Sequence, residues 1–155
     1  MRIIESKRCR TIRRVLIGMF VACAFFLSST FATAYINVDG SEKLIYMTAL
    51  NLAFGSMGAD HPVYNNPVFG MTYIIIPVVG FLFMCFDRKS NVKNLVGIIC
   101  GILGCLSIAF PIGMNGELGL GYGALISILL YLLITPISAT AVFMKIEDNR
   151  KTLEN

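Results

Sequence analysis

The fold is decided by residues 94–145, whose sequence is NLVGIICGILGCLSIAFPIGMNGELGLGYGALISILLYLLITPISATAVFMK. No charged side chain occurs in residues 95–114 or in residues 118–144. Each uncharged run meets the roughly 20 apolar residues that a helix needs to cross the ~30 Å hydrocarbon core of a bilayer. The short connection between them is rich in glycine and asparagine and carries one charge, Glu117. The stretch therefore predicts two transmembrane helices joined by a tight turn.

Small residues recur at every fourth position of both runs, which places them on one face of each helix. Such faces let two helices in a membrane approach closely and gain van der Waals contact. We expect the two helices to pack within one chain, because the turn between them is short; packing between copies of the chain is the alternative. The predicted packing residues are Gly97, Gly101, Cys105, Gly119, Gly123 and Ser127.

Two further uncharged runs precede this stretch, at residues 15–34 and 68–86. The first run follows a basic segment and ends in Ala-Thr-Ala, as a cleavable signal peptide does. Its length of nearly twenty residues instead favours a retained first span, since apolar cores of signal peptides have about 7–15 residues. Both interpretations stay open on the sequence alone.

Two prolines fall inside predicted spans, Pro77 in the second and Pro136 in the fourth. Proline removes a backbone hydrogen bond from a helix, so each should produce a kink. Neighbouring helices and water make such kinks tolerable within a membrane.

The composition agrees with a membrane protein. The chain has 155 residues, 56% of them hydrophobic and 14% charged, whereas about a quarter of the residues in a soluble domain are charged. No polar segment is long enough to form a separate domain. We expect an all-α membrane protein, one integral domain over residues 1–155 that forms a four-transmembrane-helix bundle. Its spans are predicted at about residues 15–34, 68–86, 94–113 and 118–144.

The positive charges predict the orientation. Twelve of the thirteen Lys and Arg residues lie in residues 1–14, 88–93 and 145–155. Basic residues that flank spans are usually retained in the cytoplasm, so both termini are expected to be cytoplasmic. Each basic cluster borders an apolar run, which argues against nucleic-acid binding. We therefore expect the protein to lie in the lipid bilayer of the plasma membrane.

The longest polar segment, residues 35–67, then lies outside the cytoplasm. Ser41 can cap a helix over residues 42–54, and Gly55 can end it. About a dozen apolar residues are too few to cross the membrane. A short helix in this first extracytoplasmic loop is therefore expected to lie at the membrane surface or to re-enter it.

The sequence shows no apparatus for catalysis. The four predicted spans contain no ionisable Asp, Glu, Lys, Arg or His side chain, which ion-coupled transporters and membrane enzymes usually need at membrane depth. His61 is the only histidine, and metal sites in proteins take three or four ligands. The five cysteines include no C-x-x-C pair that would indicate a redox motif. We expect no enzymatic activity, no metal and no cofactor.

The expected topology resembles the general four-span plan of claudin-like proteins. Residues 35–67 contain neither a tryptophan nor a cysteine pair, so the residues that mark claudins are absent and no family is assigned. The leading hypothesis is a non-enzymatic accessory or interaction subunit of a plasma-membrane complex, which binds a membrane-protein partner. The alternative is a small transporter or channel for an uncharged or weakly polar solute, built as a homo-oligomer.

Overall fold

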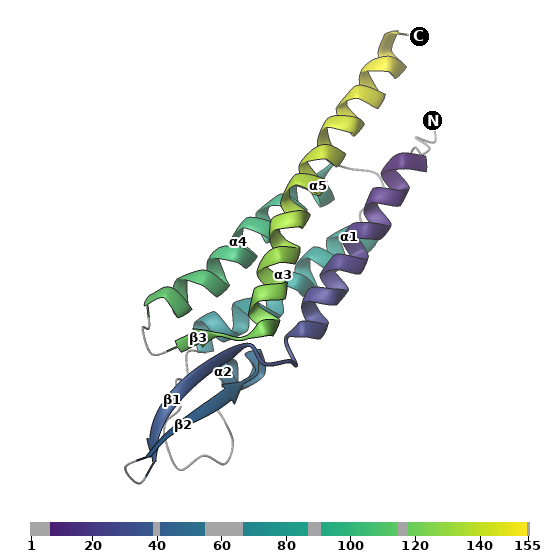
Figure 1. Ribbon diagram of the computed structural model, residues 1–155. Helices are drawn as coiled ribbons and strands as arrows, with labels where there is room; N and C mark the ends of the chain where they lie inside the picture. Colours follow the sequence, from purple (N-terminus) through teal and green to yellow (C-terminus); the bar gives the residue numbers. More distant parts are fainter. Residues whose placement is uncertain (1–6, 39–40, 55–66, 87–90, 115–117, 155) are drawn as a thin grey trace.

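The computed structural model describes residues 7–38, 41–54, 67–86, 91–114 and 118–154. The chain is mostly helical, with a small sheet at one end (Figure 1). In chain order the elements are α1 (Lys7–Phe26), β1 (Ala32–Val38), β2 (Ser41–Met47), α2 (Ala49–Phe54), α3 (Pro67–Phe86), α4 (Val92–Met114), β3 (Leu118–Leu120) and α5 (Tyr122–Glu154).

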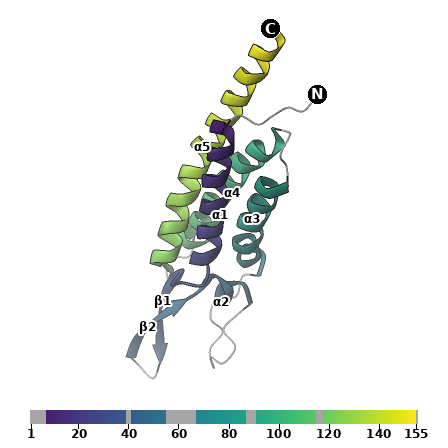
Figure 2. The ribbon, with the colours of Figure 1, turned by 90° about the vertical axis from the view of Figure 1, so that its right-hand side faces the viewer.

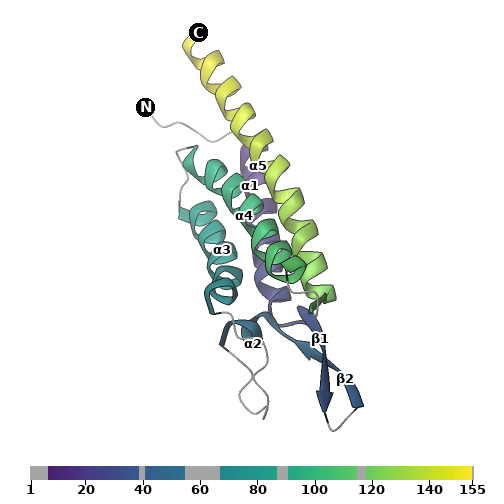
Figure 3. The same ribbon diagram turned by 90° about the vertical axis from the view of Figure 1, so that its left-hand side faces the viewer.

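Four long helices lie side by side and form most of the molecule. Helix α1 contacts α3 and α5, and α4 contacts the same two helices on the opposite side, so the four pack in a ring. Figures 2 and 3 show this arrangement from two further directions. Both chain termini lie at one end of the helices, here called the terminal end, and the sheet lies at the other, here called the sheet end (Figure 1).

Two of these helices are long and apolar enough to cross a membrane, over Val92–Phe110 in α4 and Tyr122–Glu147 in α5. A shorter apolar stretch, Gly70–Phe86, lies in α3. The expected spans at residues 68–86 and 94–113 correspond closely to α3 and α4. Helix α5 begins four residues later than expected and continues to Glu154, so part of the C-terminal segment is helical too.

The predicted first span, residues 15–34, is displaced in the structure. Helix α1 begins at Lys7 and ends at Phe26. The hydroxyls of Ser28 and Ser29 donate to the carbonyls of Phe25 and Phe26, at 2.8 and 2.6 Å, and the backbone N–H groups of the same serines also donate to these two carbonyls at the helix end. Residues 32–34, expected in the helix, belong to β1.

The predicted helix over residues 42–54 is also wrong in its first half, because residues 41–47 form strand β2. This strand pairs antiparallel with β1, with Ala34 opposite Ile45. The short helix α2 starts only at Ala49. Its cap is Thr48 rather than Ser41, since the Thr48 hydroxyl accepts the backbone N–H of Asn51 at 3.2 Å.

The third strand brings the last inter-helix turn to the sheet. In β3, Leu118 pairs with Ala34 and Leu120 with Ala32, which gives the strand order β2-β1-β3. The backbone N–H of Gly121 donates to the carbonyl of Phe31 at 3.0 Å. A Cβ atom at Gly121 would lie against the Thr30 carbonyl, so only glycine permits this approach. The start of α5 is thereby fixed to the end of α1.

The core lies between the helices and under the sheet. Helix α1 contributes Leu16, Phe20 and Cys23, all buried. The Phe20 ring fills the space beside Gly80 of α3. The remaining fully buried large side chains are Phe31, Met47, Met84, Ile108 and Ile134.

Candidate functional site

The glycines of α4 form a close contact with α5. Gly97 faces the Ser138 side chain, and Gly101 faces Thr135 and the carbonyl of Tyr131. A Cβ atom at Gly104 would lie 2.6 Å from the Tyr131 ring. Gly104 was absent from the predicted packing residues, although it lies three positions after Gly101, on nearly the same helical face.

The second set of predicted packing residues lies elsewhere. Gly119 is in strand β3, opposite Thr33, rather than on a helix. A Cβ atom at Gly123 would meet the Ser29 side chain and the carbonyls at the end of α1. The prediction that these two glycines face α4 is therefore wrong. The cause is β3, which draws residues 118–120 into the sheet and turns the start of α5 toward α1.

The last two predicted packing residues are Cys105 in α4 and Ser127 in α5. The Cys105 thiol donates to the carbonyl of Ile128 of α5, at 3.7 Å. Ser127 is buried, and its hydroxyl has no hydrogen-bond partner within the described part of the chain. The predicted kink residues, Pro77 and Pro136, lie inside α3 and α5 respectively.

A group of hydroxyls and thiols lies in the middle of the helices. The Tyr131 hydroxyl donates a hydrogen bond to the Cys23 thiol of α1. Between this tyrosine and the sheet end is a space too small for a water molecule. That space offers no room for a substrate in this conformation. It is lined by Leu27, Phe31, Tyr73, Ser107, Ile108, Ser127 and Tyr131.

The described residues hold no group of three His, Cys, Asp or Glu side chains that could share a metal ion. All five cysteines are free thiols. His61 lies outside the described residues. The expected absence of a metal and of catalysis therefore stays a prediction.

An exposed apolar surface at the sheet end lies on the β1–β2 hairpin. One face of the hairpin packs inward through Ala32, Ala34 and Met47, which are buried. The opposite face, here called the hairpin face, consists of Thr33, Tyr35, Glu42, Leu44 and Tyr46. Tyr35 and Tyr46 expose 67% and 63% of their surface. Sequence reasoning missed this surface because it treated residues 42–47 as helical.

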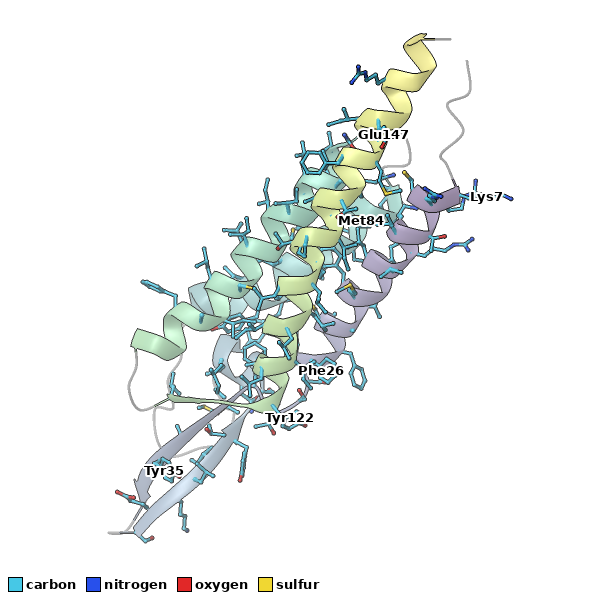
Figure 4. The ribbon with its side chains drawn as sticks, turned by 45° about the horizontal axis from the view of Figure 1, so that its top comes forward. Lys7, Phe26, Tyr35, Met84, Tyr122 and Glu147 are labelled. Carbon is cyan, nitrogen blue, oxygen red and sulfur yellow. The ribbon has the colours of Figure 1, made fainter. Side chains whose placement is uncertain are left out.

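The hairpin also has open strand edges. Within the described sheet, β2 pairs with β1 alone and is an edge strand. Strand β3 reaches only Ala34 of β1, so the outer half of β1 is paired on one side. Figure 4 shows Tyr35 on the part of the hairpin that extends beyond the helices. An exposed edge with an apolar face can accept another polypeptide by backbone pairing and side-chain contact.

Comparisons with protein-family models, with curated proteins and with solved structures found no match to this chain.

Proposed function

We propose that the protein crosses the membrane four times, through α1, α3, α4 and α5. The support is the apolar surface that these helices expose, since soluble monomers rarely expose contiguous apolar patches beyond a few hundred Å². Each of the four long helices contributes large apolar side chains to this surface. They include Val21 and Phe25 of α1, Ile75 and Leu82 of α3, Ile99, Leu103 and Leu106 of α4, and Leu125, Leu129 and Leu132 of α5.

The proposed orientation places the terminal end in the cytoplasm and the sheet end outside. Both termini lie at the same end of the helices (Figure 1), as an even number of crossings requires. The described parts of the basic segments, residues 7–14, 91–93 and 145–154, lie at that end (Figure 1). This distribution follows the retention of positive loops in the cytoplasm. The plasma membrane is the proposed location.

In this orientation, the protein acts as a non-enzymatic accessory subunit that binds another membrane protein through its β1–β2 hairpin. The observation that carries this proposal is the hairpin face with its open β2 edge. Tyrosine side chains supply large contact areas and are enriched where binding energy concentrates. The open edge adds main-chain hydrogen bonds for an extended segment of the partner.

The alternative, a homo-oligomeric channel or transporter, receives less support. Gly97, Gly101 and Gly104 of α4 are already covered by Tyr131, Thr135 and Ser138 of the same chain. They are therefore not available as a contact between copies. The hydroxyl-lined space near Tyr131 is closed to water in this conformation.

Photo-crosslinking in intact cells tests the accessory function. A photoreactive amino acid replaces Tyr46 on the hairpin face or, as the matched control, Leu129 on the exposed side of α5. We expect one discrete protein adduct from position 46 and lipid adducts from position 129. Tyr35→Ala should weaken the position 46 adduct at least tenfold, because truncating a central interface aromatic costs about 2 kcal/mol or more. An adduct that forms equally well from both positions, or in the Tyr35→Ala protein, would argue against the hairpin as the binding surface.

A further inference from the structure

Helix α1 presents basic and apolar residues on a single exposed face. Its residues Lys7, Arg10 and Arg14 are exposed, and so are Gly18, Val21 and Phe25. The spacing of these six positions is three, four, four, three and four residues, which keeps them in one line along the helix. The line begins with three cations and continues as an apolar stripe toward the sheet end.

The apolar part of α1 is too short to cross a bilayer. From Val15 to Phe26 it has 12 residues, or about 18 Å at 1.5 Å per residue. The hydrocarbon core is ~30 Å thick. In a membrane, some basic residues of α1 therefore lie at the boundary between the headgroups and the hydrocarbon core, or inside the core.

Contacts with the other helices locate that level. Cys23 meets Tyr131 of α5, and the same tyrosine covers Gly104 of α4. Arg14 lies nine residues from Cys23 toward the terminal end, about 13 Å along the helix. An equal rise along the neighbouring helices reaches Thr140 of α5 and Leu95 of α4.

At this level α4 still exposes apolar side chains, although Lys93 and Asn94 near its start are buried. Leu95 exposes 50% of its surface, and Val92, Phe143 and Ile146 continue an exposed apolar surface closer to the terminal end. Figure 4 shows Lys7 and Glu147 toward that end of the molecule, and Phe26 and Tyr122 toward the sheet end. Arg14 thus lies at a level where α4 still exposes apolar side chains to lipid. A cation at such depth requires an anionic partner or access to the headgroup layer.

The local electrostatics of α1 also favour an anion. Lys7 and Arg10 are three residues apart, and Arg10 and Arg14 are four apart, so these like charges repel each other along the face. A bound anion would relieve this repulsion.

Gly18 leaves an open notch just below the three cations. A Cβ atom at this position would meet nothing within 4 Å. Val21 and Phe25 continue the surface below the notch and are half or more exposed. From Arg14 to Phe25 the helix rises about 16 Å, close to the ~15 Å depth of one leaflet of hydrocarbon.

We propose that Lys7, Arg10 and Arg14 bind the headgroup of one anionic phospholipid of the cytoplasmic leaflet. Its acyl chain lies over Gly18 and along Val21 and Phe25. The headgroup supplies the negative charge that balances the basic residues of α1, which the short apolar length of this helix holds close to the hydrocarbon core. This inference rests on the proposed membrane insertion and orientation.

Lipid retention by the detergent-purified protein tests the site, with native mass spectrometry as the readout. Phosphatidylglycerol and phosphatidylcholine with identical acyl chains are added at equal concentration. We expect preferential retention of phosphatidylglycerol, and free glycerol 3-phosphate should not displace it because the acyl chain contributes to binding. Equal retention of both lipids, or displacement by the free headgroup, would overturn the proposal.

Two charge-matched triple variants locate the site. Lys7→Gln, Arg10→Gln and Arg14→Gln together should weaken phosphatidylglycerol binding about a hundredfold, since each charge near an anionic surface contributes roughly fivefold. The control combines Arg8→Gln, Arg150→Gln and Lys151→Gln, which remove the same charge away from the exposed line on α1. The control should retain the lipid preference. Equal loss in both variants would show unspecific attraction rather than a site.

A substitution at Gly18 tests the acyl-chain part of the site without changing any charge. The Cβ atom of Gly18→Leu meets nothing within 4 Å, so we expect the protein to fold normally and to bind phosphatidylglycerol about tenfold more weakly. Ala24→Leu adds a side chain at an exposed position of α1 outside the line and serves as the control. Unchanged lipid binding in the Gly18→Leu protein would contradict the proposal. Release of the wild-type protein from membranes by alkaline carbonate would instead contradict the proposed membrane insertion itself.

Discussion

Helices α1 and α5 are neighbours, yet they differ in the length of apolar surface that they bring to the membrane. Helix α5 has 23 consecutive residues without a charge, residues 122–144, or about 34 Å. Helix α1 has 12 such residues before its basic turns begin. The comparison shows that helix length and spanning length are separate properties. In our account α5 crosses the bilayer by its own composition, whereas α1 crosses through its contacts with the other helices and with lipid headgroups.

The largest expected effect concerns the contact that holds α1 to α3. Phe20 is fully buried and its ring fills the space beside Gly80. Phe20→Ala should lower the free energy of unfolding by about 3–5 kcal/mol, because it leaves a cavity in the core. Thermal unfolding of the detergent-purified protein measures this loss. Phe25→Ala, at a residue that is 71% exposed, is the control and should change the unfolding free energy little. Equal effects at the two positions would mean that α1 is not packed as described.

A smaller effect is expected where α5 packs against α4. Gly101 lies against Thr135 and the Tyr131 backbone, so Gly101→Leu forces a side chain into a filled contact. Overpacking of this kind typically costs ~1–3 kcal/mol. The purified monomer should therefore unfold at a lower temperature. A variant that loses an oligomer while each protomer keeps its stability would place the contact between chains and revive the channel hypothesis.

The smallest effect is a stabilisation. Gly18 is in the interior of α1, and a Cβ atom there meets nothing. Gly18→Ala should raise the free energy of unfolding by up to ~1 kcal/mol, which is the difference in helix propensity between the two residues. Chemical or thermal unfolding of matched preparations measures it. A destabilised Gly18→Ala protein would reveal a neighbour on this face that the structure does not contain.

The long helices could be predicted from the sequence because their signal is local. Residues 68–86 and 94–113 carry no charge over the length of a span, and α3 and α4 extend only one or two residues beyond them. The β1–β2 hairpin also has a local signal, the Asp39-Gly40 pair between the two strands, which the helical interpretation overlooked. The third strand could not be predicted in this way. Strand β1 pairs with β3, which lies more than eighty residues later in the chain, and no local pattern records that pairing.

The predicted packing residues were likewise correct within one helix and wrong where the chain leaves the helix. Gly97 and Gly101 repeat at helical spacing within one helix, and the structure places both against α5. Gly119 and Gly123 repeat with the same spacing, yet one is in a strand and the other lies against the end of α1. A spacing of four identifies a shared face only when the intervening residues are all helical. The hairpin face was missed for a different reason, since residues 42–47 were assigned to a helix although Asp39-Gly40 precedes them as a hairpin turn would.

The central claim is that α1 crosses the membrane and separates the basic terminal end from the hairpin. Single cysteines at positions 8, 46 and 150 in a cysteine-free background, treated with an impermeant thiol reagent on intact cells, test it most directly. The account predicts labelling of Tyr46→Cys alone, and labelling of Arg8→Cys and Arg150→Cys only after the cells are opened. Labelling of Arg8→Cys together with Tyr46→Cys on intact cells would contradict the account, because the two ends of α1 would then lie on the same side of the membrane.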